Sequence, residues 1–160
     1  MVGSIVRASG PFCAVAAATL GVLSIGAGTA LGGSRAVAAR TISLSENATL
    51  RAAPHAGNTI HELGEATGTY RCRITVDLRI VSTNRVAASF TVTPAGGTVS
   101  GTGSARFVSK GAFGYVGGEL SITKGTGRFA HASGRNIGFS GKFNRETFIA
   151  SIQVHGTIHV

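Results

Sequence analysis

Cysteine and acidic side chains are scarce in this chain of 160 residues, and tryptophan is absent. One of the two cysteines, Cys13, lies in an apolar N-terminal segment, so Cys72 is the single cysteine of the remainder, where no intramolecular disulfide can form. The five histidines are scattered and Cys72 has no thiol partner, so the sequence predicts neither a metal site nor a cofactor. A folded domain in this chain must therefore gain its stability from its own core.

Negative charge is also scarce. All six Asp and Glu residues follow residue 38, together with thirteen of the fifteen Lys and Arg, which gives that part a net charge of +7. Such a surface suits an anionic partner, such as an envelope surface, although a basic bias also serves solubility alone. The cations fall singly along strands and turns with few aromatic residues between them, which argues against a specific nucleic-acid partner.

The first 38 residues have the pattern of a cleaved signal peptide. Residues 11–33 contain no charged side chain, and Ala36-Val37-Ala38 has the small-x-small spacing that a signal peptidase recognises. An uncleaved membrane anchor is the alternative. We expect a signal peptide over residues 1–38 and a single domain over residues 39–160, secreted to the periplasm or the extracellular space.

From Thr41 onward the hydrophobic pattern has a period of two, which is typical of strands with one buried and one wet face. No stretch has the pattern of a long amphipathic helix, and most turns are short, with residues 51–67 interpreted as one longer loop. The sequence therefore predicts an all-β fold, a single antiparallel up-and-down β-barrel of about eight strands. Closure would also hide the last strand, an apolar row from Phe148 to Val160.

Two details of the strand pattern lead to specific expectations. Phe113 and Tyr115 have the opposite parity to Leu120 and Ile122, and Gly117-Gly118 lies between the two pairs. A β-bulge at these glycines would turn both pairs toward the interior. Tyr115 would then lie inside the barrel, where its hydroxyl could cap a cavity.

Several glycine-rich segments follow one another in an order that is found in a known group of proteins. They are Gly68-Thr-Tyr-Arg-Cys72, Gly101-Thr-Gly103, Gly117-Gly-Glu-Leu-Ser-Ile122, Gly125-Thr-Gly-Arg-Phe129 and Ala132-Ser-Gly134. This order resembles the allene oxide cyclase and dirigent barrel families, in particular small exported bacterial members of unassigned role. The resemblance implies an eight-stranded antiparallel barrel with a central cavity, in many members as a homo-oligomer.

The same resemblance draws attention to two polar residues. In the plant cyclases a carboxylate on the first strand and a cysteine, both in the cavity, help to steer the cyclisation of an unstable epoxide, and Glu46 and Cys72 fall near those places. The parity of Glu46 matches Ile42, Leu44 and Leu50, so it should point inward, where burial would raise its pKa. The plainer interpretations are a frayed strand end for Glu46 and an inert buried thiol for Cys72.

The candidate site residues are thus few. Glu46 and Cys72 are the catalytic candidates if the protein is an enzyme, and the ligand-binding candidates are Glu46, Cys72, Phe90 and Tyr115. His55 and His61 are interpreted as residues of a solvated loop, together with Glu62 and Glu65. The alternative is that they line the mouth of the barrel or bind a metal loosely.

Three functions fit these features. The first is a non-catalytic binder of a small apolar ligand or of an envelope surface, the second a cyclase or isomerase that confines a reactive intermediate, and the third a structural or adhesive envelope protein. A ligand binder or an enzyme needs an open cavity. A structural barrel would instead be filled by its phenylalanines, namely Phe90, Phe107, Phe129, Phe139, Phe143 and Phe148.

Overall fold

The computed structural model describes residues 40–53 and 57–160, and most of these residues lie in eight β-strands. The strands are β1 (Thr41–Ala52), β2 (Thr59–Gly68), β3 (Cys72–Ser82), β4 (Arg85–Thr93), β5 (Val99–Lys110), β6 (Phe113–Gly125), β7 (Gly134–Asn144) and β8 (Ile149–His159), with a short 3₁₀ helix, η1 (Gly127–Phe129), between β6 and β7. The signal peptide predicted for residues 1–38 and the alternative anchor lie outside the described residues, as does His55. No helix within the described part is long and apolar enough to cross a bilayer.

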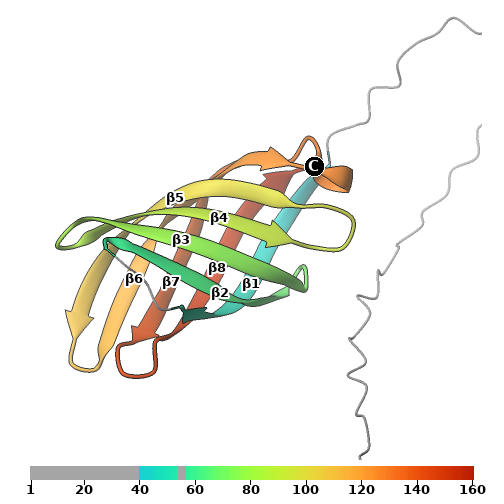
Figure 1. The fold of residues 1–160 in the computed structure, drawn as a ribbon. Helices are drawn as coiled ribbons and strands as arrows, with labels where there is room; N and C mark the ends of the chain where they lie inside the picture. The colour runs from blue at the N-terminus through green and yellow to red at the C-terminus, as the bar shows by residue number, and fades with distance from the viewer. Residues whose placement is uncertain (1–39, 54–56) are drawn as a thin grey trace, which may run out of the picture. The chain divides into compact units, whose positions relative to one another are not determined.

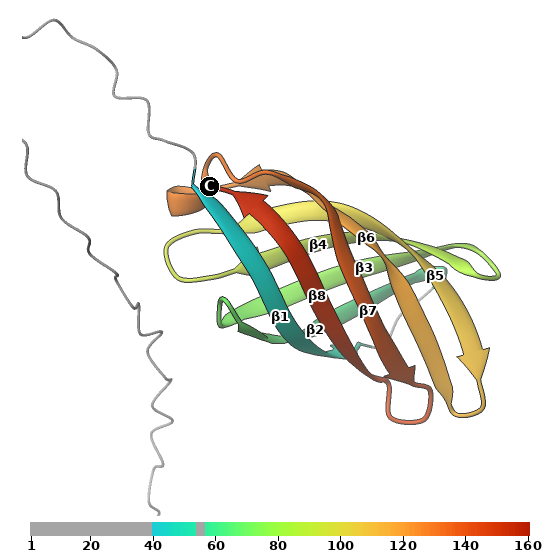
Figure 2. The same cartoon turned by 180° about the vertical axis from the view of Figure 1, so that it is seen from behind.

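Each strand pairs antiparallel with the next one along the chain, and β1 pairs with β8 to close the sheet into a barrel. Figures 1 and 2 show the barrel from opposite sides, and β1 and β8 lie side by side in both. The predicted all-β fold, a single antiparallel up-and-down barrel of eight strands, is therefore confirmed. Closure leaves no unpaired strand edge, which explains why the apolar strand β8 is not an exposed edge.

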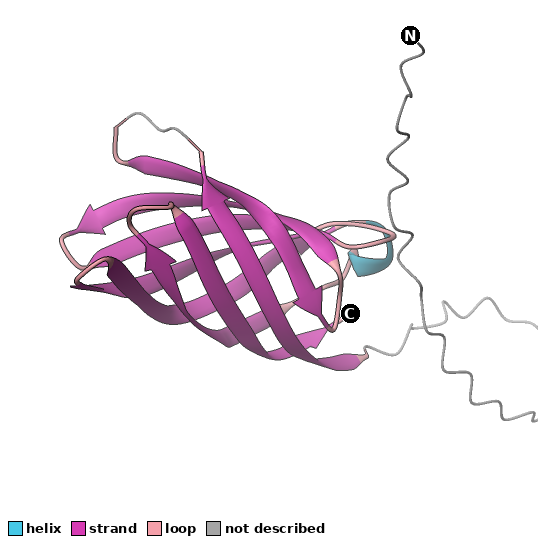
Figure 3. Ribbon diagram, turned by 90° about the horizontal axis from the view of Figure 1, so that it is seen from below, coloured by secondary structure: helices cyan, strands magenta, loops and turns pink. Residues whose placement is uncertain are grey.

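The two ends of the barrel differ. The short helix η1 lies at the end where β1 begins and β8 finishes (Figure 3), and Phe129 is buried there at 2% exposure against Val99 and Ala132. The Phe129 ring meets the Tyr70 ring edge to face, with centroids 5.7 Å apart. We call this the closed end, and the end with the β1–β2, β3–β4, β5–β6 and β7–β8 turns the open end.

The interpretation of residues 51–67 as a loop was wrong, because most of that segment forms the end of β1 and nearly all of β2. The inward positions of β2 are Ile60, Glu62, Gly64 and Ala66, of which Ile60 is the one large hydrocarbon side chain. The usual apolar row is therefore missing from the sequence of this strand. A closed barrel of antiparallel neighbours needs an even number of strands, and this requirement could have revealed β2.

The expectation of a β-bulge at Gly117-Gly118 was also wrong. β5 and β6 pair without interruption from Lys110–Phe113 to Gly101–Ile122, and the register shifts only beyond that, at Thr123. Phe113 and Tyr115 consequently face outward and are 37% and 48% exposed. Phe148 does not begin the last buried row either, because it lies in the β7–β8 turn at φ 56° and is 52% exposed.

Candidate functional site

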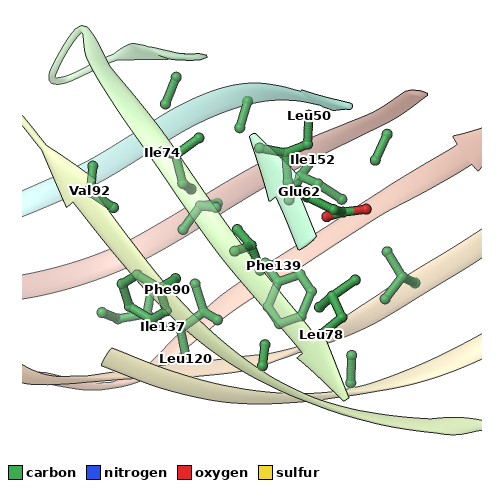
Figure 4. Close-up of a pocket in the computed structure, with 18 of the residues that line it drawn as sticks. Leu50, Glu62, Ile74, Leu78, Phe90, Val92, Leu120, Ile137, Phe139 and Ile152 are labelled. Carbon is green, nitrogen blue, oxygen red and sulfur yellow. The ribbon is translucent and has the colours of Figure 1, made fainter. Parts of the chain in front are cut away.

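The barrel encloses a cavity of about 400 Å³ that runs from η1 at the closed end to the β3–β4 turn at the open end. Its wall consists mainly of inward-facing aliphatic and aromatic side chains, and Figure 4 shows those of Leu50, Ile74, Leu78, Phe90 and Ile152, among others, around it. The interior of this barrel is thus an apolar space and not a core packed shut.

The phenylalanines line this space and do not fill it, because two of their rings lie against glycines in the wall. Phe90 pairs across the strands with Gly101, and a methyl group at Gly101 would come within 2.5 Å of the Phe90 ring. Gly114 likewise has no side chain, and the Phe107 ring occupies the space that a methyl group at Gly114 would need. Glycine in a strand permits such close approach, so the Phe90 and Phe107 rings occupy the space over these glycines and line the cavity beside it.

The cavity reaches solvent at the open end. Ile80 lines the cavity and is nevertheless 46% exposed, and the exposed side chains of Ser82, Thr83 and Arg85 complete the lining there. At the closed end the lining residues Phe129 and Val99 are buried. A molecule would therefore enter past the β3–β4 turn.

Glu46 and Cys72, the two residues suggested by the resemblance, both line the cavity toward its closed end. The Tyr70 amide donates a hydrogen bond to Oε1 of Glu46 at 2.8 Å, and the Cys72 thiol donates to the Tyr70 carbonyl oxygen at 3.7 Å. Burial raises the pKa of Glu46, and the hydrogen bond from Tyr70 opposes this effect. Glu46 thus points inward as its parity predicted, and it also anchors the β2–β3 turn.

Glu62 is the second acidic residue of the cavity wall, so its interpretation as part of a solvated loop was wrong. It is 6% exposed and lies on β2 between Ala52 of β1 and Val76 of β3. No hydrogen bond or ion pair to its carboxyl group is formed by any residue of the two described segments. Burial alone raises the pKa of Glu62 to about 7.

The remaining candidate residues divide into those that line the cavity and those on the outer face of the barrel. Phe90 lines the cavity, as a ligand-binding residue must, whereas Tyr115 lies on the outer face and is not part of the lining, so the expected inward position of Tyr115 was wrong. His61 belongs to β2, on the outside, where its ring bonds to the Asp77 carboxylate. The ionisable side chains that line the cavity, as far as the structure describes it, are Glu46, Glu62, Tyr70, Cys72 and Arg85.

No cluster of three or more potential metal ligands is found in residues 40–53 and 57–160. Comparison of the chain with protein-family models, with curated proteins and with solved structures gives no match.

Proposed function

We propose that this protein binds a small apolar ligand inside its barrel and does not transform it chemically. The observation that carries the proposal is the cavity of about 400 Å³ with its mainly hydrocarbon wall. Its volume falls within the range of about 300 to 1,000 Å³ that is usual for ligand pockets. Water in such a space finds few hydrogen-bond partners, whereas an apolar ligand gains free energy by burying its own surface there.

Few groups in the wall could perform chemistry. Cys72 donates its thiol hydrogen to a backbone carbonyl, and the lining contains neither histidine nor lysine within the described residues. A nucleophilic mechanism needs a base next to the nucleophile. A cyclase that acts by confinement would need Glu46 as its polar group, and Glu46→Gln in the folded protein would then abolish turnover.

Two neighbouring alanines of β4 provide a matched test. Ala88 lines the cavity, whereas Ala87 belongs to the outer face of the same strand. Ala88→Phe should fill part of the cavity and weaken binding of a neutral naphthalene dye at least tenfold, about 1.4 kcal/mol, while Ala87→Phe should leave it unchanged. Equal binding by both variants, or no dye binding by the wild type, would refute the proposal.

A second role, docking on an anionic lipid surface, is favoured by the distribution of exposed apolar side chains. Among the described residues, the large ones all lie in the half of the barrel toward the open end, and they are Leu63, Ile80, Val81, Val108, Phe113, Tyr115 and Phe148. Exposed apolar groups gathered in this way mark an interaction surface.

The charges of the same region indicate the partner. On the outer face of β5 and β6, Val108 pairs with Tyr115 and Lys110 pairs with Phe113, while Nζ of Lys142 lies 5.9 Å from the centre of the Phe113 ring. Apolar side chains flanked by cations suit an anionic bilayer surface, and the mouth of the cavity would then face the membrane. Two acidic residues lie in the same half, Glu146 in the β7–β8 turn and Asp77 on the outer face of β3, where Asp77 pairs with His61.

Lys110 and Lys124 make the matched pair for this role, since both are exposed and they lie at the open and the closed end respectively. Lys110→Gln should weaken binding to phosphatidylglycerol vesicles more than Lys124→Gln does, and added salt should weaken binding further. Equal effects of the two substitutions would contradict docking through the open end.

A further inference from the structure

The apolar wall contains a carboxyl group, that of Glu62, to which no residue of the described segments bonds. Glu62 is 6% exposed, its neighbours across the strands are Ala52 and Val76, and the hydrocarbon side chains of Leu50 and Ile152 lie beside it in Figure 4. Unlike Oε2 of Glu46, the Glu62 oxygens keep some accessible surface, so a hydrogen-bonding group in the cavity can reach them. Such a bond would offset part of the cost of burying the carboxyl group, about 1 to 3 kcal/mol.

Glu46, the other acidic residue of the wall, is in a different situation. Its Oε1 accepts the hydrogen bond from the Tyr70 amide at 2.8 Å, whereas its Oε2 is fully buried close to Gly68 and has no hydrogen-bond partner among the described residues. Glu46 therefore has a structural role at the β2–β3 turn, toward the closed end, which Glu62 lacks.

The position of Glu62 along the barrel agrees with a role in binding. Only one inward residue of β2, Ile60, lies nearer to the open end. The wall continues from Glu62 toward the closed end through Ile74, Phe90 and Ile137, all hydrocarbon. A ligand with its polar end at Glu62 could thus extend an apolar body into the deeper part of the cavity.

We propose that the natural ligand is an amphiphile with a hydroxyl group, an aliphatic alcohol, whose hydroxyl hydrogen-bonds to the Glu62 carboxyl while its hydrocarbon part lies along the apolar wall. This inference rests on the proposed function, because it names the class of ligand for the same cavity.

A hydroxyl group suits Glu62 better than a carboxylate or a hydrocarbon end does. It can donate to a carboxylate and accept from a carboxylic acid, and both forms are populated near neutral pH because burial raises the pKa of Glu62 to about 7. A fatty acid would place a second negative charge beside Glu62 when both are ionised, which is unfavourable in an apolar site. An alkane would leave the carboxyl group unpaired.

Three probes with the same chain length separate these cases: octanol, octane and octanoate. Their dissociation constants would be measured by displacement of the naphthalene dye from the full chain near pH 8. The variants are Glu62→Leu, which removes the hydrogen bond, and Glu62→Gln, which retains a donor and an acceptor. Glu65→Leu, on the exposed outer face of the same strand, is the control. Circular dichroism of each variant confirms that it is folded.

The expected result is that Glu62→Leu weakens octanol binding about tenfold and leaves octane binding unchanged or tighter, because one hydrogen bond of about 1.4 kcal/mol is lost. Glu62→Gln should stay within about threefold of the wild type for octanol, Glu65→Leu should have no effect, and octanoate should bind more weakly than octanol.

Several results would overturn the inference while apolar ligand binding itself stands. They are equal effects of Glu62→Leu on octanol and octane, binding of octane without binding of octanol, octanoate as tight as octanol, and a loss of octanol binding in Glu46→Leu but not in Glu62→Leu. Failure of octanol and octane alike to bind the wild type would refute both proposals.

Discussion

Replacing Glu62 by glutamine should stabilise the barrel at neutral to alkaline pH and have little effect on its stability in acid. Burial raises the pKa of Glu62 from an ordinary 4.5 to about 7 in the folded protein. Between these two values the unfolded chain has released this proton while the folded protein keeps it, so the wild type loses stability as pH rises. Below about 4.5 both states are protonated, and the contribution of the neutral carboxyl is then fully present.

The magnitude follows from the size of the shift. Each pKa unit corresponds to about 1.36 kcal/mol, so a shift from 4.5 to about 7 costs the wild type about 3 kcal/mol above neutral pH. This figure is an upper bound, since water entering from the open end would solvate the carboxylate in part. Glutamine has nearly the same shape and cannot ionise, so it should escape this loss of stability.

The measurement is the free energy of unfolding of the wild type and of Glu62→Gln in urea, from about pH 4 to about pH 8.5. The difference between the two proteins should grow between about pH 4.5 and about pH 7 and then stay constant. Glu46, whose pKa is also raised by burial, is present in both proteins and cancels in the difference. Glu65→Gln, at an exposed position of the same strand, should give a difference that does not follow this course.

A difference for Glu62→Gln that is independent of pH would refute the reasoning. It would mean that the Glu62 carboxylate is well solvated or paired in the folded protein, and the argument for a ligand hydroxyl at this position would lose its basis.

Further predictions concern the closed end, the wall and the outer face. Phe129→Ala should destabilise the barrel by about 3 to 5 kcal/mol, since this side chain is 2% exposed and closes the cavity, while Phe113→Ala, at 37% exposure, should cost less than about 1 kcal/mol in thermal unfolding. Gly118→Ala would place its methyl group on the Ser104 carbonyl oxygen of the adjacent strand and should cost about 2 kcal/mol. Gly117→Ala meets nothing closer than the Phe139 carbonyl oxygen at 3.7 Å and should change stability by less than about 0.5 kcal/mol; a larger cost for Gly117→Ala than for Gly118→Ala would contradict the register of β6. Tyr115→Ser should leave dye binding in the cavity unchanged but reduce binding to phosphatidylglycerol vesicles, and any loss of dye binding would place this side chain inside the barrel.

The sequence by itself determined the strands whose two faces differ in chemistry. In β3 the row Cys72, Ile74, Val76, Leu78 and Ile80 alternates with polar residues or arginine, and the structure turns this row inward as predicted. The same alternation correctly oriented Glu46 on β1, since a side chain on a strand reverses direction at every residue. Short turns between such strands were sufficient to predict an up-and-down barrel.

Only the tertiary structure decided which side chains face the interior of the barrel. β2 has little apolar pattern of its own and becomes a strand because β1 and β3 both offer it hydrogen-bonding partners, which also buries Glu62. The bulge lies at Thr123 and not at the glycines, so Phe113 and Tyr115 face outward despite their hydrophobicity. Whether the phenylalanines fill or line the interior depends on which residues face them across the strands. Phe90 lies against Gly101, a neighbour eleven residues away whose register no local pattern specifies, and from there its ring lines the cavity.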